Sequence, residues 1–147
     1  MSCYVTFFNG DITEQSPARQ DPNFDVEKVP TLFYLNQRSE LGECFDVFPF
    51  DDPKLLTKEH IVRIRERVNR YRNDIRHNIE AINEIKNALL KNLPTDDYEE
   101  AVTRIHDLNE ELAELNGDIE FSCEKLGALE VAESLINDGA SVTVVVG

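Results

Sequence analysis

The clearest pattern in this sequence is a seven-residue repeat of apolar positions through its middle. From Ile61 onward two core positions recur, and eight of their first ten occupants are apolar. One position holds Ile61, Val68, Ile75, Ile82 and Leu89, and the other holds Ile64, Tyr71, Asn78, Ile85 and Asn92. A repeat of this period predicts a long helix that packs along another helix. Thr57 is the expected N-cap, and Asp52-Pro53 offers an earlier start.

A second heptad pattern follows after a break at Pro94. Thr95-Asp96-Asp97 supplies a capping oxygen and negative charge for a new helix start. Nine of its ten core positions are apolar or alanine: Tyr98, Ala101, Ile105, Leu108, Leu112, Leu115, Ile119, Ser122, Leu126 and Leu129. Because about four residues join the two patterns, we expect an antiparallel helical hairpin over residues 56–130.

Antiparallel pairing fixes a register in which paired residue numbers sum to a constant. With a sum of 190, Ile82 meets Leu108 and Ile75 meets Leu115, and the register closes inside the Pro94 loop. About 33 helical residues at 1.5 Å each give an arm of about 50 Å. The expected core consists of Ile64, Val68, Tyr71, Ile75, Ile82, Leu108, Leu112, Leu115 and Ile119.

The positions beside this core leave two packing arrangements open. Like charges face each other at Asp74 and Asp118 and at Arg67 and Lys125, which would weaken an isolated hairpin. Apolar side chains in one flanking position also widen the stripe: Ile79, Val102 and Cys123. A wide stripe faces more than one neighbour. The hairpin is therefore expected to pack on a sheet at its base, or on a second copy as a dimeric four-helix bundle.

The ends of the chain read as strands. β-Branched and aromatic residues over Cys3–Phe8 precede Asn9-Gly10, which suits a tight hairpin turn. A long loop is expected over Asp11–Asn23, with further strands at Thr31–Leu35 and at Cys44–Phe48. Between the last two, Gly42 lies in the expected connection.

After the second helix, Asn137-Asp138-Gly139 forms a helix stop, and the valine-rich run Ser141–Val146 predicts a strand that returns to the N-terminal sheet. The fold class is therefore α+β: a long antiparallel helical hairpin that projects from a small antiparallel sheet made by the N-terminal strands and a C-terminal strand. Within a single domain, residues 1–55 form the β region, 56–130 the hairpin, and 131–147 the helix end and C-terminal strand.

Charge divides the 147-residue chain into three parts. It has 15 basic and 29 acidic side chains, a net charge of −14, but residues 56–92 carry +4 whereas residues 1–55 carry −6 and residues 93–147 carry −12. Apolar runs are too short for a membrane helix, and the first residues lack a signal-type pattern, so a cytoplasmic location is expected.

Catalytic motifs are absent from the sequence. It has no P-loop, GxGxxG, GxSxG or HExxH pattern, and its three cysteines and three histidines are isolated, so no cofactor is expected. Cysteines within apolar strands are expected to be reduced and packed. The alternative is a metal-dependent enzyme or small-ligand binder that uses the acidic loops around Asp46, Asp51 and Asp52, with Glu40 and Glu43 nearby.

Two charged surfaces offer candidate binding sites. Six arginines in fourteen residues could contact phosphates: Arg63, Arg65, Arg67, Arg70, Arg72 and Arg76. The overall negative charge opposes this, so pairing with carboxylates is the favoured interpretation and direct nucleic-acid binding is not expected. The second surface is acidic, with carboxylates three and four residues apart: Asp107, Glu110, Glu114, Asp118, Glu120 and Glu124, joined by Glu99, Glu100 and Glu111.

Helical spacing sets those carboxylates roughly 5 to 6 Å apart. Backbone phosphates of a nucleic acid have a similar separation, so such a helix could mimic them; a solvated acidic helix is the other interpretation. The resulting hypothesis is a non-enzymatic protein-binding module that could act as an inhibitor. Its acidic hairpin would bind a basic or nucleic-acid-handling protein, alone or as a homodimer.

Overall fold

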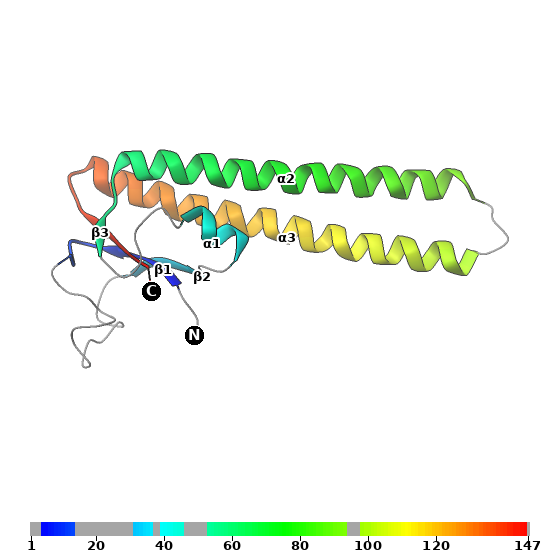
Figure 1. The fold of residues 1–147 in the computed structure, drawn as a ribbon, viewed down its shortest axis with the longest axis horizontal. Helices are drawn as coiled ribbons and strands as arrows, with labels where there is room; N and C mark the ends of the chain where they lie inside the picture. The colour runs from blue at the N-terminus through cyan, green and yellow to red at the C-terminus, as the bar shows by residue number, and fades with distance from the viewer. Residues whose placement is uncertain (1–3, 14–30, 37–38, 46–52, 94–97, 147) are drawn as a thin grey trace, which may run out of the picture. The chain divides into compact units, whose positions relative to one another are not determined.

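The computed structural model describes residues 4–13, 31–36, 39–45, 53–93 and 98–146. These residues fall into two compact units, one comprising residues 1–71 and 124–147 and the other residues 72–123. The elements are β1 (Tyr4–Asn9), β2 (Thr31–Asn36), α1 (Glu40–Phe45), β3 (Lys54–Leu55), α2 (Lys58–Lys91), α3 (Tyr98–Asn137) and β4 (Val142–Val146). Both long helices run through the two units. The α+β class is confirmed: the chain combines an antiparallel sheet with two long helices that pack against each other (Figure 1).

The first unit contains a four-stranded antiparallel sheet in the order β2-β1-β4-β3. The predicted return of the C-terminal strand to the N-terminal sheet is confirmed, because β4 pairs with β1, with Phe7 opposite Val144. All five residues of β4 are buried. Side chains alternate between the two faces of a strand, so an unbroken run of buried residues is typical of a central strand covered on both faces.

One face of this sheet carries the core of the first unit. Val5 and Phe7 from β1 and Val144 from β4 are fully buried there, together with Ile64 of α2 and Leu129 of α3. The start of α2 and the end of α3 therefore pack on the sheet, one of the two arrangements expected for the wide apolar stripe. Burial of each large side chain of this kind contributes about 1.5 to 3 kcal/mol.

The predicted tight hairpin at Asn9-Gly10 is wrong. Gly10 does adopt a positive φ of 122°, but among the described residues the next strand after β1 begins at Thr31. Instead, the N–H of Gly10 donates to the carbonyl of Ser141 at 2.8 Å, and the N–H of Ile12 donates to Oγ1 of Thr143 at 3.1 Å. The chain after β1 thus stays beside β4, which satisfies its backbone groups. Of the expected loop, only Asp11–Thr13 lies within the described residues, and it has no helix or strand.

The predicted third strand at Cys44–Phe48 is also wrong, since Cys44 and Phe45 end helix α1, while residues 46–48 lie outside the described residues. Ser39 caps this helix: its Oγ accepts from the N–H of Gly42 at 2.9 Å. The buried side chains Leu41, Cys44 and Phe45 have helical three- and four-residue spacing. Phe45 packs edge-to-face on Phe7, with ring centroids 6.1 Å apart.

The ends of the long helices follow the predicted capping chemistry. His60 N–H donates to Oγ1 of Thr57, the residue before α2, at 3.3 Å. At the end of α3, Gly139 has a positive φ of 89°, and its N–H donates to the carbonyl of Ile136 at 3.0 Å. The N–H of Ala140 donates to the carbonyl of Leu135 at 2.9 Å, which completes a Schellman motif. The expected helix start at residues 95–97 lies outside the described residues.

The second unit contains the helix pair formed by residues 72–91 of α2 and 98–123 of α3, which lie side by side (Figure 1). Ile75 and Leu108 are buried, and Ile82, Leu115 and Ile119 are partly buried. Ser122 occupies a core position and is fully buried, and its hydroxyl donates to the carbonyl of Ile119 at 2.6 Å. The buried Ser122 hydroxyl therefore has a hydrogen-bond partner within its own helix.

None of the helices in the described part of the chain is both long and apolar enough to cross a membrane.

Candidate functional site

A large hollow lies in the second unit, on the pair of helices. It has a volume of about 930 Å³. Its lining combines three apolar side chains with a carboxylate-rich rim: Ile82, Ile85, Glu99, Glu100, Thr103, Arg104, Asp107, Leu108, Glu110, Glu111 and Glu114. A second hollow of about 320 Å³ shares Ile82, Glu111 and Glu114 with it. The two hollows together are here called the acidic groove.

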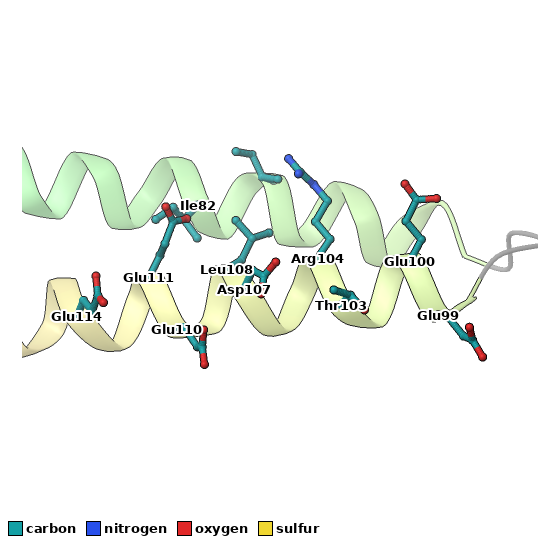
Figure 2. A pocket seen from close by; sticks show the side chains of 11 residues that line it. Ile82, Glu99, Glu100, Thr103, Arg104, Asp107, Leu108, Glu110, Glu111 and Glu114 are labelled. Carbon is teal, nitrogen blue, oxygen red and sulfur yellow. The ribbon is translucent and has the colours of Figure 1, made fainter.

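The floor of the acidic groove comes from both helices. Ile82 and Leu108, which the predicted register pairs, line it from α2 and α3, and Ile85 extends the floor along α2. Leu108 is buried, whereas 42% of the Ile85 side chain's surface is exposed. In Figure 2, Arg104, Leu108 and Glu111 extend from α3 toward α2. The groove therefore offers accessible apolar surface beneath charged side chains.

The rim is strongly negative because helical spacing gathers carboxylates on α3. Residues 98–123 contain eight acidic side chains and one Lys or Arg, Arg104. His106 is near the rim, with Nε2 3.2 Å from the Glu110 carboxylate one turn away. The rim carboxylates are exposed to solvent. Acidic side chains at a surface attract cationic groups over the screening length of about 8 Å at physiological salt.

The predicted partner-binding residues separate between the two units. Asp107, Glu110 and Glu114 line the acidic groove, while Asp118 and Glu120 are exposed further along α3 in the same unit and do not line it. Glu124 belongs to the first unit. The sequence pattern does not single out Thr103 or Arg104, although Arg104 interrupts the acidic run and that interruption is a usable signal. The heptad pattern places Ile82 and Ile85 in the interface between the two helices, so it does not identify them as residues of the groove.

The predicted core residues are also divided between the two units. Ile64 and Val68 are fully buried in the first unit, where Tyr71 packs against the same core. In the second unit, Ile75 is buried, but Ile82, Leu112, Leu115 and Ile119 keep part of their surface accessible.

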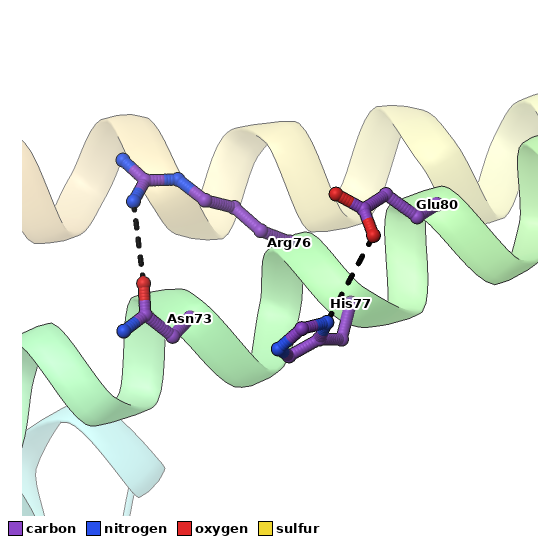
Figure 3. Close-up of polar contacts among 4 residues, drawn as sticks. All are labelled: Asn73, Arg76, His77 and Glu80. Atoms are coloured by element: carbon purple, nitrogen blue, oxygen red, sulfur yellow. Dashed lines mark hydrogen bonds and ion pairs between the residues drawn. The ribbon is translucent and has the colours of Figure 1, made fainter.

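The arginines of α2 make different contacts. Arg65 forms an ion pair with Glu133 of α3 within the first unit, which fits the interpretation that these arginines pair with carboxylates. Arg76 instead donates to Oδ1 of Asn73 at 3.4 Å on its own helix, and His77 lies 3.9 Å from the Glu80 carboxylate (Figure 3). Arg63 and Arg70 are exposed.

Two of the three cysteines, Cys44 and Cys123, lie within the described residues. Cys44 is buried, and its Sγ lies 3.5 Å from the carbonyl of Glu40. Burial is the main cause that raises the pKa of its thiol, and the positive charge of Arg67 opposes this shift. A raised pKa disfavours the nucleophilic thiolate. Cys123 is exposed and free. No group of three His, Cys, Asp or Glu within the described ranges could hold a metal ion, and Asp46, Asp51 and Asp52 lie outside those ranges.

No protein-family model, curated protein or solved structure matches this chain. The candidate site therefore rests on the chain's own residues, and the acidic groove is the described surface that combines a hollow, accessible apolar atoms and concentrated charge.

Proposed function

We propose that this protein is a non-enzymatic binding module whose helix pair holds a basic protein partner against the acidic groove. The observation that carries this proposal is the arrangement of the hollow: carboxylates of α3, including Asp107, Glu110 and Glu114, line the same hollow as the apolar side chains Ile82 and Leu108. A cationic protein surface gains electrostatic attraction from the rim and apolar contact with the floor. Complementary charge accelerates and orients such an encounter.

A partner that handles nucleic acids is the more specific form of this proposal. Its phosphate-binding surface carries Lys and Arg side chains. Carboxylates roughly 5 to 6 Å apart on a helix could bind these side chains in place of the backbone phosphates of a nucleic acid. Occupation of that surface would inhibit nucleic-acid binding by competition. This form predicts that added DNA releases the captured partner, whereas a partner without nucleic-acid affinity stays bound.

Affinity capture with charge-reversed variants tests the proposal. The variant Asp107→Lys/Glu110→Lys/Glu114→Lys changes the groove, and the matched control Glu59→Lys/Glu66→Lys/Glu130→Lys makes the same charge change at positions of the first unit. Proteins captured from the source cells are identified by mass spectrometry. The proposal expects basic proteins that bind the native chain and the control but not the groove variant. Equal capture by both variants would exclude the groove as the binding site.

A further inference from the structure

The shape of the acidic groove indicates the class of structure that it binds. Its lining along α3 runs from Glu99 to Glu114, which at 1.5 Å per residue is about 22 Å. The second hollow extends the acidic groove to Leu115. This length corresponds to about four turns of a third helix laid along the pair.

The backbone chemistry of the groove favours a helix over an extended peptide. The walls are helices, whose backbone N–H and C=O groups are already paired within α2 and α3. An extended peptide would find few backbone partners over the apolar floor of Ile82, Ile85 and Leu108, and unpaired buried backbone groups are costly. A helix satisfies its own backbone and needs only side-chain contacts.

The charges and the apolar floor define the faces of that helix. The floor would receive apolar side chains spaced three and four residues apart, as in other helix-in-groove complexes. The rim would receive Lys or Arg on the side of that stripe nearest α3, since its carboxylates, including Glu100, Asp107 and Glu111, all belong to α3. Arg104 is the only Lys or Arg among the lining residues, all of which are described.

We infer that the acidic groove binds a basic amphipathic α-helix of the partner, which packs as a third helix against α2 and α3. This inference rests on the proposed function and specifies its ligand. A second copy of this chain is a poorer occupant, because the strongly acidic α3 would be brought beside another acidic helix unless the basic part of α2 faced it.

Three synthetic peptides of about sixteen residues test this inference by fluorescence anisotropy on the full chain. The first is an amphipathic Lys/Leu helix, the second is its scrambled sequence with the same composition, and the third is oligolysine. We expect the amphipathic peptide to bind about tenfold or more tightly than the scrambled one, a difference of about 1.4 kcal/mol, and to gain helical circular dichroism on binding. Equal affinity for all three peptides would overturn the inference.

Paired variants distinguish the floor from the rim. Ile85→Ser removes exposed apolar surface from the groove, and Val62→Ser makes a similar change at a 54% exposed position in the first unit. Ile85→Ser should lower the affinity for the amphipathic peptide by about fivefold to tenfold, because the variant truncates one partly buried apolar contact. It should leave oligolysine unchanged, and Val62→Ser should affect neither peptide. If Ile85→Ser binds the amphipathic peptide with unchanged affinity, the inference is overturned.

The outcomes separate this inference from the proposed function. If the three peptides bind equally and the Asp107→Lys/Glu110→Lys/Glu114→Lys variant still loses them, the acidic surface binds basic partners but not as a helix receptor. If no basic peptide or protein binds, the proposed function fails as well. A rise in mass of the protein alone at micromolar concentration that Ile85→Ser abolishes would identify a second copy as the occupant and overturn the inference.

Discussion

Thr57 and His60 cap the start of α2 reciprocally. The N–H of His60 donates to Oγ1 of Thr57 at 3.3 Å, and the N–H of Thr57 donates to Nδ1 of His60 at 3.1 Å. The arrangement matches a capping box in which an imidazole replaces the usual Glu or Gln. Because Nδ1 must lack a proton to accept this bond, the cap depends on the neutral form of His60.

The first prediction follows from the protonation of this cap. Burial, followed by the positive charge of Arg63, lowers the pKa of His60 below its ordinary 6.5, and Glu59 opposes the shift. The unfolded chain therefore binds the proton more readily, so the stabilisation is fully present above pH 6.5 and is lost as pH falls through the lower folded-state pKa. Urea unfolding of the native chain should show this loss, and His60→Gln, which cannot titrate, should reduce it. An identical pH dependence in both proteins would contradict the prediction.

The second prediction concerns the hydroxyl of Thr143 in β4. It is fully buried, accepts from the N–H of Ile12 and donates to the carbonyl of Gly10 at 2.6 Å. Thr143→Val keeps the shape but leaves both backbone groups without this partner, which should lower the free energy of unfolding by about 1 to 3 kcal/mol. Thr143→Ser keeps the hydroxyl and should cost about 1 kcal/mol for the lost methyl group. A larger loss for Thr143→Ser than for Thr143→Val would show that packing, not hydrogen bonding, dominates at this position.

The third prediction compares two glycines of the α3 region. Gly139 has a positive φ, and no heavy atom lies within 4 Å of the place that an added Cβ would take, so Gly139→Ala should cost about 1 to 2 kcal/mol through backbone strain alone. Gly127 lies inside α3 with similar open space, so Gly127→Ala should stabilise the protein by up to about 1 kcal/mol. Thermal unfolding of the two variants measures both signs. Equal effects would contradict the Schellman assignment.

The fourth prediction concerns self-association. The expected homodimer stays a prediction, and Tyr98 and Val102, which are 56% and 67% exposed at the start of α3, are apolar residues available for it. If they form a dimer contact, light scattering at micromolar concentration should give twice the chain mass, and Val102→Glu should restore the monomer. A monomeric native chain would exclude the four-helix arrangement.

The long helices and the last strand could be predicted because their signals extend over many residues. Heptad spacing from Ile61 to Leu129 is a repeated pattern, and capping residues such as Thr57 and Gly139 mark its ends. Short elements carry weaker signals. Helix α1 has six residues, and its Cys44-Phe45 end resembles a strand in composition; only the spacing from Leu41 and the Ser39 cap indicate a helix. Strand β3 has only two residues, so its sequence carries no strand pattern and the strand is defined by its pairing with β4.

The acidic groove is only partly predictable for a related reason. The carboxylates of α3 lie on one chain segment, so their spacing places Asp107, Glu110 and Glu114 on one side of a helix. The floor depends on how two segments meet, so the sequence alone does not reveal that Ile85 keeps accessible surface or that Arg104 lines the hollow. Heptad patterns identify positions near a seam, but the depth to which each side chain is buried depends on the packed pair.

The fifth prediction tests the charge of this groove. Arg104→Gln removes the only Lys or Arg among its described lining residues, which should strengthen the binding of the amphipathic Lys/Leu peptide by about twofold at low salt, with the gain lost as salt screens the rim. Lys125→Gln makes the same charge change on α3 in the first unit and should have a smaller effect. A weaker complex for Arg104→Gln would show that Arg104 contributes to binding.

The binding footprint of the peptide on the chain shows directly whether the acidic groove receives a helix. Backbone amide chemical shifts of the isotope-labelled chain are recorded as the amphipathic Lys/Leu peptide is added. We expect the largest changes at Ile82, Ile85 and Leu108 and along the α3 rim from Glu99 to Glu114. Changes confined to the sheet or to the exposed Arg63 and Arg70 surface of α2, or no changes at all, would contradict it.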